Sequence, residues 1–235
     1  MRDRFLNLLI DSYREQYKHR EDNFIHVSNL VDFCGREYAL CQKYNILYNT
    51  KKIVSLGDII TFRMGDLIHD DLRNTLELSG AIQPQDREIK LLSNRFRYPI
   101  TGSIDGALNL GYPKKIPLEI KSIGQAEVFD ALTEPLVNHE CQLSLYLWLA
   151  EEMKLKKIDY KRGIIVYAVK LKRSMPFKVF EIKRNDIFIG NTIKKLNELK
   201  AFSVKGELPK KICSTPHALM ARQRCRLPKI CFRED

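Results

Sequence analysis

The chain has 235 residues, of which 44% are hydrophobic, and this is enough for one well-buried core. It contains no run of 18 apolar residues, and charges are spread through the first 20 residues. These features exclude a membrane span and a secretory leader, and they predict a cytoplasmic protein, or one of the host cytoplasm if the gene is viral. The formal net charge of +11 favours polyanions such as nucleic acids as partners. A membrane is not expected as a partner.

The first third of the chain is predicted to be helical. Residues 2–20 have an amphipathic pattern, and Ser28 is expected to cap a second helix that continues through residues 29–44. Residues 57–80 predict a third helix, which Gly80 ends because glycine readily adopts the left-handed conformation found after helices.

Short apolar runs broken by Gly, Pro and Asn then predict a sheet. We expect strands within 87–92, 96–110, 115–124, 162–172 and 177–183, a long helix within 134–154, another within 185–202, and a cysteine-bearing tail. This order predicts an α/β core, in which a mixed central sheet is flanked by helices. No linker divides the chain, so residues 1–235 are expected to form a single domain.

Two acidic residues and a lysine are placed as in a cation site. Asp105 ends one expected strand, and Glu119 and Lys121 stand two residues apart on the next, so they share one face. If the strands are neighbours, the two carboxylates meet at an oxygen-rich site for Mg²⁺ or Mn²⁺, to which the carbonyl of Ile120 can contribute. Such a cation activates water against a phosphodiester while an ammonium balances charge. The alternative is a surface ion pair between Glu119 and Lys121 on an edge strand.

Two further motifs flank this stretch: Gly65-x-x-x-His69 lies upstream, and Gln142-x-x-x-Tyr146 lies downstream on the expected long helix. With the acidic pair and the lysine between them, the motifs follow the order found in RecB-like PD-(D/E)XK nucleases, which the chain resembles. The resemblance implies a restriction-endonuclease-like core and metal-dependent hydrolysis of DNA.

The same resemblance implies roles for individual side chains. It makes His69 an additional metal ligand. It also makes Gln142 and Tyr146 the residues that orient Lys121 and touch the nucleic acid backbone. Asp70, which follows His69, is interpreted as a solvated charge on the helix.

Six cysteines in a chain expected to be cytoplasmic favour metal ligands or core residues over disulfides. Part of the superfamily, including the CRISPR-associated RecB-like exonucleases, ties one N-terminal and three C-terminal cysteines around a 4Fe-4S cluster. The resemblance implies such a cluster here. Its four ligands would be Cys34, Cys213, Cys225 and Cys231.

The cysteine pattern departs from the family at one position. Cys34 begins a Cys-x-Arg-x-Tyr motif, but Arg222 stands where a further C-terminal cysteine is expected, so Cys213 replaces it. Four thiolates would equally suit Zn²⁺, and Cys41 is the alternative fourth ligand. Cys141 is interpreted as a buried apolar residue. Residues 1–57 and 205–235 are expected to form the cluster-bearing part of the domain.

By analogy with these relatives, the expected activity is that of a DNA exonuclease on single-stranded ends. The expected setting is CRISPR adaptation, or recombination and DNA processing in phages and other mobile elements. Helicase, recombination or CRISPR adaptation proteins are the corresponding partners. Two alternatives stay open, a nucleic-acid-binding module without catalysis and a zinc-stabilised adaptor protein.

Overall fold

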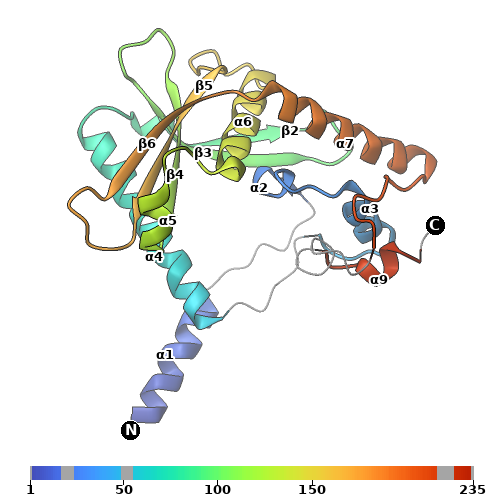
Figure 1. The fold of residues 1–235 in the computed structure, drawn as a ribbon, viewed down its shortest axis with the longest axis horizontal. Helices are drawn as coiled ribbons and strands as arrows, with labels where there is room; N and C mark the ends of the chain where they lie inside the picture. Colours follow the sequence, from blue (N-terminus) through green and yellow to red (C-terminus); the bar gives the residue numbers. More distant parts are fainter. Residues whose placement is uncertain (1, 17–23, 49–54, 216–224, 234–235) are drawn as a thin grey trace.

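The computed structural model describes residues 2–16, 24–48, 55–215 and 225–233 of the chain. They form a six-stranded mixed sheet flanked by helices (Figure 1), which confirms the predicted α/β class. Within these ranges, no helix combines the length and the apolar character that a membrane crossing requires.

The elements follow the predicted order closely. The helices are α1 (Arg2–Gln16), α2 (Val27–Leu30), α3 (Gly35–Lys43), α4 (Leu56–Leu78), α5 (Ala126–Ala131), α6 (Val137–Glu152), α7 (Asp186–Lys205) and α9 (Pro228–Cys231), with a 3-10 turn η1 (Pro84–Asp86). The strands are β1 (Ile25–His26), β2 (Arg87–Ser93), β3 (Ile100–Leu108), β4 (Ile116–Ile123), β5 (Arg162–Val169) and β6 (Phe177–Lys183).

The sheet has the order β1-β3-β4-β5-β6, and β2 also pairs with β3. Strands β2, β3 and β4 form an antiparallel meander, β4 and β5 are parallel, and β5 and β6 are antiparallel. The parallel step is possible because α5 and α6 carry the chain back across the sheet between β4 and β5. Strand β4 therefore lies inside the sheet, with a neighbour on each side.

Two hydrophobic cores cover the two faces of the sheet. Leu118 and Ile120 of β4 belong to the smaller core, against which Leu72 and Leu76 of α4 pack. The larger core contains Ile165 and most of α6. The alternation of strand side chains thus sends neighbouring residues of β4 to opposite layers.

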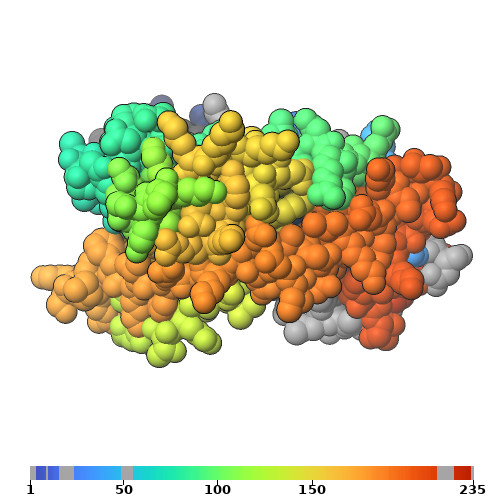
Figure 2. Space-filling model, turned by 90° about the horizontal axis from the view of Figure 1, so that it is seen from above, coloured from blue at the N-terminus to red at the C-terminus, as the bar shows by residue number. Residues whose placement is uncertain are grey.

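Helix α6 is buried along most of its length because it has protein on every side. Its residues Cys141 and Leu143 to Ala150 are all buried. The helix contacts β2, β3 and β5 of the sheet and also α2 and α7. Seen from above, β6 and α7 form a continuous orange band along the molecule (Figure 2), so α7 covers the side of the structure next to α6.

The prediction of one continuous helix after Ser28 is wrong. Two short helices replace it: α2, which contains Ser28 and starts after His26, and α3. They are separate because Cys34 has an extended backbone, with φ −109° and ψ 101°, and caps α3 by accepting a hydrogen bond from the N–H of Glu37 at its sulfur. Strand β1 and helix α5 were not predicted, and residues 17–20 of the first predicted helix lie outside the described residues.

Replacing two glycines by alanine should change the stability of the protein in opposite directions. An alanine Cβ at Gly163 of β5 would lie 2.9 Å from Cδ2 of Leu143 and 3.1 Å from the carbonyl oxygen of Pro117, whereas at Gly190 of α7 it would meet nothing within 4 Å. Gly163→Ala should lower the free energy of unfolding by about 1–3 kcal/mol through overpacking. Gly190→Ala should raise it by about 0.5–1 kcal/mol, because alanine favours the helix. Urea unfolding of the two variants measures both changes, and equal effects would contradict the packing of α6 on β5.

Candidate active site

The sheet opens beside Asp105, where β3 and β4 diverge. The ladder between the two strands runs from Leu108 opposite Ile116 to Gly106 opposite Leu118. One residue further along β3, Oδ2 of Asp105 accepts a hydrogen bond of 2.7 Å from the backbone N–H of Ile120. The carboxylate therefore takes the place of a strand carbonyl and fixes Asp105 against β4 at the start of the opening.

Glu119 is a buried carboxylate in the middle of the sheet. The residue is 3% exposed, and its Oε1 lies 2.6 Å from Nζ of Lys121. Its Oε2 is buried and has no hydrogen-bond partner among the described residues. Burial raises the pKa of Glu119 to about 7, the ammonium of Lys121 opposes this shift, and the charge of Asp105 adds to it. A surface ion pair on an edge strand is therefore excluded.

A chain of hydrogen bonds links Lys121 to α6. The Nζ of Lys121 donates to Oε1 of Gln142 at 3.0 Å, and Nε2 of Gln142 donates to the hydroxyl of Tyr146 at 2.8 Å. The four-residue spacing of Gln142 and Tyr146 puts them on one face of the helix, as predicted. The structure thus brings Gln142 into contact with Lys121, and its role in orienting the lysine stays a prediction.

Gly102 was missed by the sequence reasoning, although it makes room for Tyr146. A Cβ at this position of β3 would lie 2.6 Å from Cε1 of Tyr146 and 3.0 Å from Cγ2 of Val27. A larger residue would therefore displace the aromatic ring or α2. The only signal in the sequence is a glycine within a strand, which often marks a close approach.

His69 reaches the site from α4. Its Nδ1 lies 3.5 Å from Oδ1 of Asp105. One turn earlier on the same helix, Gly65 is buried, and a Cβ there would lie 3.0 Å from Oγ of Ser122 on β4. The glycine of the Gly-x-x-x-His motif thus lets α4 approach β4 closely enough to bring His69 beside Asp105.

Arg73 and Glu88 were also missed. Arg73 follows His69 by one turn, and its Nη1 lies 2.9 Å from Oε1 of Glu88 on β2 and 3.5 Å from Oδ1 of Asp105. Its Nη2 lies 2.7 Å from Oδ1 of Asp70, so Asp70 pairs with this guanidinium although it is half-exposed. The interpretation of Asp70 as a solvated charge is therefore wrong in part.

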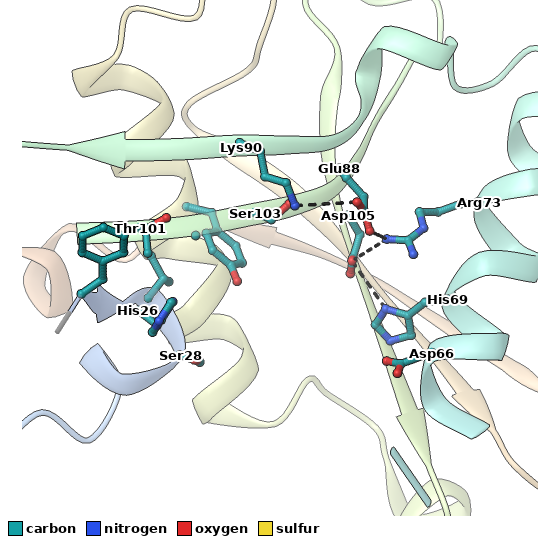
Figure 3. A pocket seen from close by; sticks show the side chains of 14 residues that line it. His26, Ser28, Asp66, His69, Arg73, Glu88, Lys90, Thr101, Ser103 and Asp105 are labelled. Carbon is teal, nitrogen blue, oxygen red and sulfur yellow. Dashed lines mark hydrogen bonds and ion pairs between the residues drawn. The ribbon is translucent and has the colours of Figure 1, made fainter. Parts of the chain in front are cut away.

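Of these residues, His69, Arg73, Glu88 and Asp105 line a polar pocket of about 500 Å³, whereas Glu119 and Lys121 are not among the residues that line it. Figure 3 shows His69, Arg73, Glu88 and Asp105 pointing toward one another at one end of it. The pocket continues along β3 past Ser103 and Thr101 toward His26 and Ser28 at α2.

Among the described residues, no three His, Cys, Asp or Glu side chains are grouped so as to hold a metal ion, either at this site or among the cysteines. The types of donor found here, carboxylates and an imidazole, are those that Mn²⁺ binds. Asp105 and His69 are adjacent, and the charges of both act on Glu119, whose Oε2 lacks a partner. A buried carboxylate oxygen without a donor is costly, and a cation would relieve that cost. The structure ties Ile120 to Asp105 through its N–H, and the role of its carbonyl stays a prediction.

The four cysteines predicted to share a metal line one small cavity of about 40 Å³. They are Cys34 at the start of α3, Cys213 after α7, Cys225, and Cys231 at the end of α9. Cys41 and Cys141 are buried and are not among the residues that line it. Burial raises the pKa of the Cys34 thiol and raises that of Cys225 to about 12, so a metal would have to displace protons there.

Buried polar side chains of α3 hold the C-terminal segment of the described chain at this cavity. Arg36 donates from Nη1 to the carbonyl of Pro209 at 3.1 Å and from Nη2 to the carbonyl of Cys231 at 3.5 Å. Oε1 of Glu37 accepts from the N–H of Arg226 at 2.8 Å. Figure 1 shows the result, with α9 beside α3. The arginine of the Cys-x-Arg-x-Tyr motif thus holds the C-terminal segment through its backbone.

His139 lies one turn before Gln142 on α6 and was not predicted. Its Nδ1 lies 2.9 Å from the hydroxyl of Tyr167, which accepts a hydrogen bond from the N–H of Leu136 at 3.0 Å. Which of the two groups donates depends on the tautomer of the imidazole. Burial and the nearby charge of Lys121 lower the pKa of His139 to about 4.

The comparisons with known proteins bear on the fold that carries this site. No family model matches the chain. A CRISPR-associated exonuclease Cas4 of Saccharolobus solfataricus is 25% identical over 193 residues, which cover 81% of this chain and 83% of that protein. The crystal structure of SSO0001 has a TM-score of 0.50 at 20% identity and covers 88% of this chain and 98% of its own. The crystal structure of an alkaline exonuclease of Laribacter hongkongensis has a TM-score of 0.55 at 14% identity. It covers 80% of this chain and 91% of its own. These likenesses confirm the predicted PD-(D/E)XK fold and the resemblance to its exonucleases.

The pKa of His139 predicts a pH-dependent stability. Because the folded pKa, about 4, lies below the ordinary value of 6.5, the unfolded chain takes up the proton first as the pH falls. The contribution of the neutral His139 to the free energy of unfolding is complete above pH 6.5 and is lost as the pH falls toward 4. His139→Gln, whose amide can still form a hydrogen bond with Tyr167 and does not titrate, should therefore lose less thermal stability than the wild type between about pH 7.5 and about pH 5. Equal losses in the two proteins would contradict a neutral His139.

Proposed function

We propose that the protein is a metal-dependent deoxyribonuclease that hydrolyses phosphodiester bonds as an exonuclease. The observation that carries the proposal is the hydrogen bond that fixes Asp105 to Ile120, the residue between Glu119 and Lys121 on β4, with His69 beside Asp105. The exonuclease relatives support it, since the Cas4 exonuclease is similar in sequence over 81% of this chain and the alkaline exonuclease is similar in fold over 80% of it.

The cation would be held by Asp105, Glu119 and His69, with the carbonyl of Ile120 as a further oxygen ligand. Oxygen ligands suit Mg²⁺ and Mn²⁺, and the imidazole favours Mn²⁺. Once bound, such a cation polarises a phosphoryl oxygen and lowers the pKa of a coordinated water.

Lys121 supplies the fixed positive charge of the site. Its ammonium is held between Oε1 of Glu119 and Oε1 of Gln142, at 2.6 and 3.0 Å. In this position it holds the attacking water and balances the negative charge that grows on the phosphate. Gln142 presents its oxygen to the lysine because its amide nitrogen is engaged by Tyr146.

The proposed substrate is the end of single-stranded DNA. A pocket of about 500 Å³ that runs from Asp105 along β3 offers room beside the reacting phosphate, and a net charge of +11 attracts the strand. The Cas4 relative supports a role in CRISPR adaptation, and recombination or DNA processing in a phage is the alternative setting. Helicase, recombination or adaptation proteins are the corresponding partners.

We further propose that Cys34, Cys213, Cys225 and Cys231 hold a 4Fe-4S cluster, with Zn²⁺ as the alternative. Their common cavity supports the proposal. The cluster would stabilise the contact between α3 and the C-terminal segment, so that residues 1–57 and 205–235 form one cluster-bearing part of a single domain.

Removal of either metal carboxylate should abolish cleavage. Asp105→Asn and Glu119→Gln keep the size of each side chain but remove its charge, so cleavage of end-labelled DNA with Mg²⁺ or Mn²⁺ should fall by at least about 100-fold. Single-stranded and duplex substrates, labelled at either end, will show the preferred substrate and the direction of digestion.

Glu181→Gln on β6 is the matched control, because this carboxylate is 60% exposed and pairs with Arg162. It should cleave like the wild type. DNA binding by the wild type without cleavage under either metal would refute the nuclease and favour the binding module.

The cysteine site predicts a colour and a metal content. Protein purified without oxygen should be brown, with absorption near about 400 nm, and should contain iron and sulfide. Cys231→Ser should lose the colour and unfold at lower temperature, while Cys141→Ser, which changes a buried thiol outside the cavity, should keep it. If the wild type is colourless and contains one zinc ion, the cysteines hold Zn²⁺. If it contains neither iron nor zinc, the proposed metal site is refuted.

A further inference from the structure

Glu88 has a backbone conformation that its place in the fold does not explain. Three non-glycine residues within the described ranges have positive φ: Asn45, Glu88 and Lys154. Asn45 and Lys154 each follow the C-cap of a helix, α3 or α6, where the left-handed conformation is common. Glu88, with φ 49°, lies inside β2. A side chain rarely adopts this conformation within a strand, and strain of this kind is often retained near functional sites.

The sheet places this strained residue opposite Asp105. Arg87 pairs with Gly106 and Ile89 pairs with Ile104, so Glu88 lies across from Asp105. Its carboxylate lines the same pocket as Asp105 and points to Arg73 in Figure 3, where Oε1 of Glu88 lies 2.9 Å from Nη1. The unusual backbone thus serves a contact within the active site.

Arg73 carries this contact to Asp105. The same Nη1 lies 3.5 Å from Oδ1 of Asp105, while Oδ2 is fixed by the N–H of Ile120. The side chain of Arg73 is only 8% exposed, and its Nε is buried without a hydrogen-bond partner in the described part of the chain. A buried guanidinium that leaves one donor unsatisfied is costly unless its position serves another purpose.

Adhesion between α4 and β2 does not require this pair. Arg87 already joins the two elements, because its Nη1 lies 2.6 Å from Oδ1 of Asn74 and 3.4 Å from Oε2 of Glu77. Unlike the contacts of Arg87, the pair of Glu88 and Arg73 reaches Asp105.

We propose that Glu88 and Arg73 are positioning residues for Asp105. Glu88 holds the guanidinium of Arg73, which sets the direction of Oδ1 while Ile120 sets that of Oδ2. The carboxylate is then oriented before a cation arrives, and the guanidinium balances the charge that Asp105 and Glu119 place close together. The inference rests on the proposed function, because it takes Asp105 as a cation ligand.

Glu88→Gly separates positioning from stability. Glycine accepts positive φ, so this variant should unfold at the same temperature as the wild type or at a higher one. The loss of the carboxylate should lower the affinity for Mn²⁺, measured by calorimetry without DNA, and the cleavage rate by about 10-fold each, as when a partner of a metal ligand is removed. Glu88→Gln, which keeps the side-chain length, should show the same losses of affinity and rate.

Arg73→Gln and the double variant Arg73→Gln/Glu88→Gln test whether the two residues act as one unit. If they do, the double variant should bind Mn²⁺ no more weakly than Arg73→Gln alone. Glu77→Gln is the matched control, because it removes a carboxylate of the same interface that pairs with Arg87. It should leave Mn²⁺ affinity and cleavage unchanged.

The outcomes separate this inference from the nuclease proposal. If Glu88→Gly and the wild type bind Mn²⁺ with equal affinity and cleave DNA at equal rates, the inference alone is overturned. A wild type that binds Mn²⁺ but cleaves no DNA would overturn the proposed function, while the Mn²⁺ affinities of the variants would still decide the positioning role. A wild type that binds no Mn²⁺ would overturn both.

Discussion

The hydrogen bond from the backbone N–H of Ile120 to Asp105 is the contact on which the candidate site depends. It lies where the ladder between β3 and β4 ends, and a side-chain oxygen there replaces the missing carbonyl. Because the strands part at this point, side chains from both layers of helices can meet in the sheet. His69 and Arg73 come from α4, and Gln142 comes from α6. A continuous ladder would keep these layers apart.

Much of this arrangement could be predicted from the sequence. Alternation along one strand was enough to place Glu119 and Lys121 on the same face, and the four-residue spacing was enough to place Gln142 and Tyr146 together. The elements between residues 87 and 202, apart from the six-residue helix α5, were predicted because their patterns are long and regular. The roles of these residues in catalysis stay predictions, since the structure shows only that they meet.

The remaining features depend on three-dimensional pairing that no local pattern records. Arg73 and Glu88 are ordinary charged residues in the sequence, and they meet only through the register of β2 with β3 and one left-handed backbone angle. The break between α2 and α3 was missed because the extended backbone of Cys34 interrupts an otherwise helical pattern. Strand β1 has two residues, too few for any periodicity to appear.

The contacts of α3 with the C-terminal segment also affect the order of folding during synthesis. Arg36 lies 195 residues before Cys231, whose carbonyl accepts one of its hydrogen bonds, and Glu37 lies 189 residues before Arg226. At a translation rate of about 5–20 residues per second, α3 leaves the ribosome many seconds before these partners. During that interval the buried charges of α3 lack the backbone groups that satisfy them, so α3 cannot reach its final packing until almost the whole of the described chain has been made.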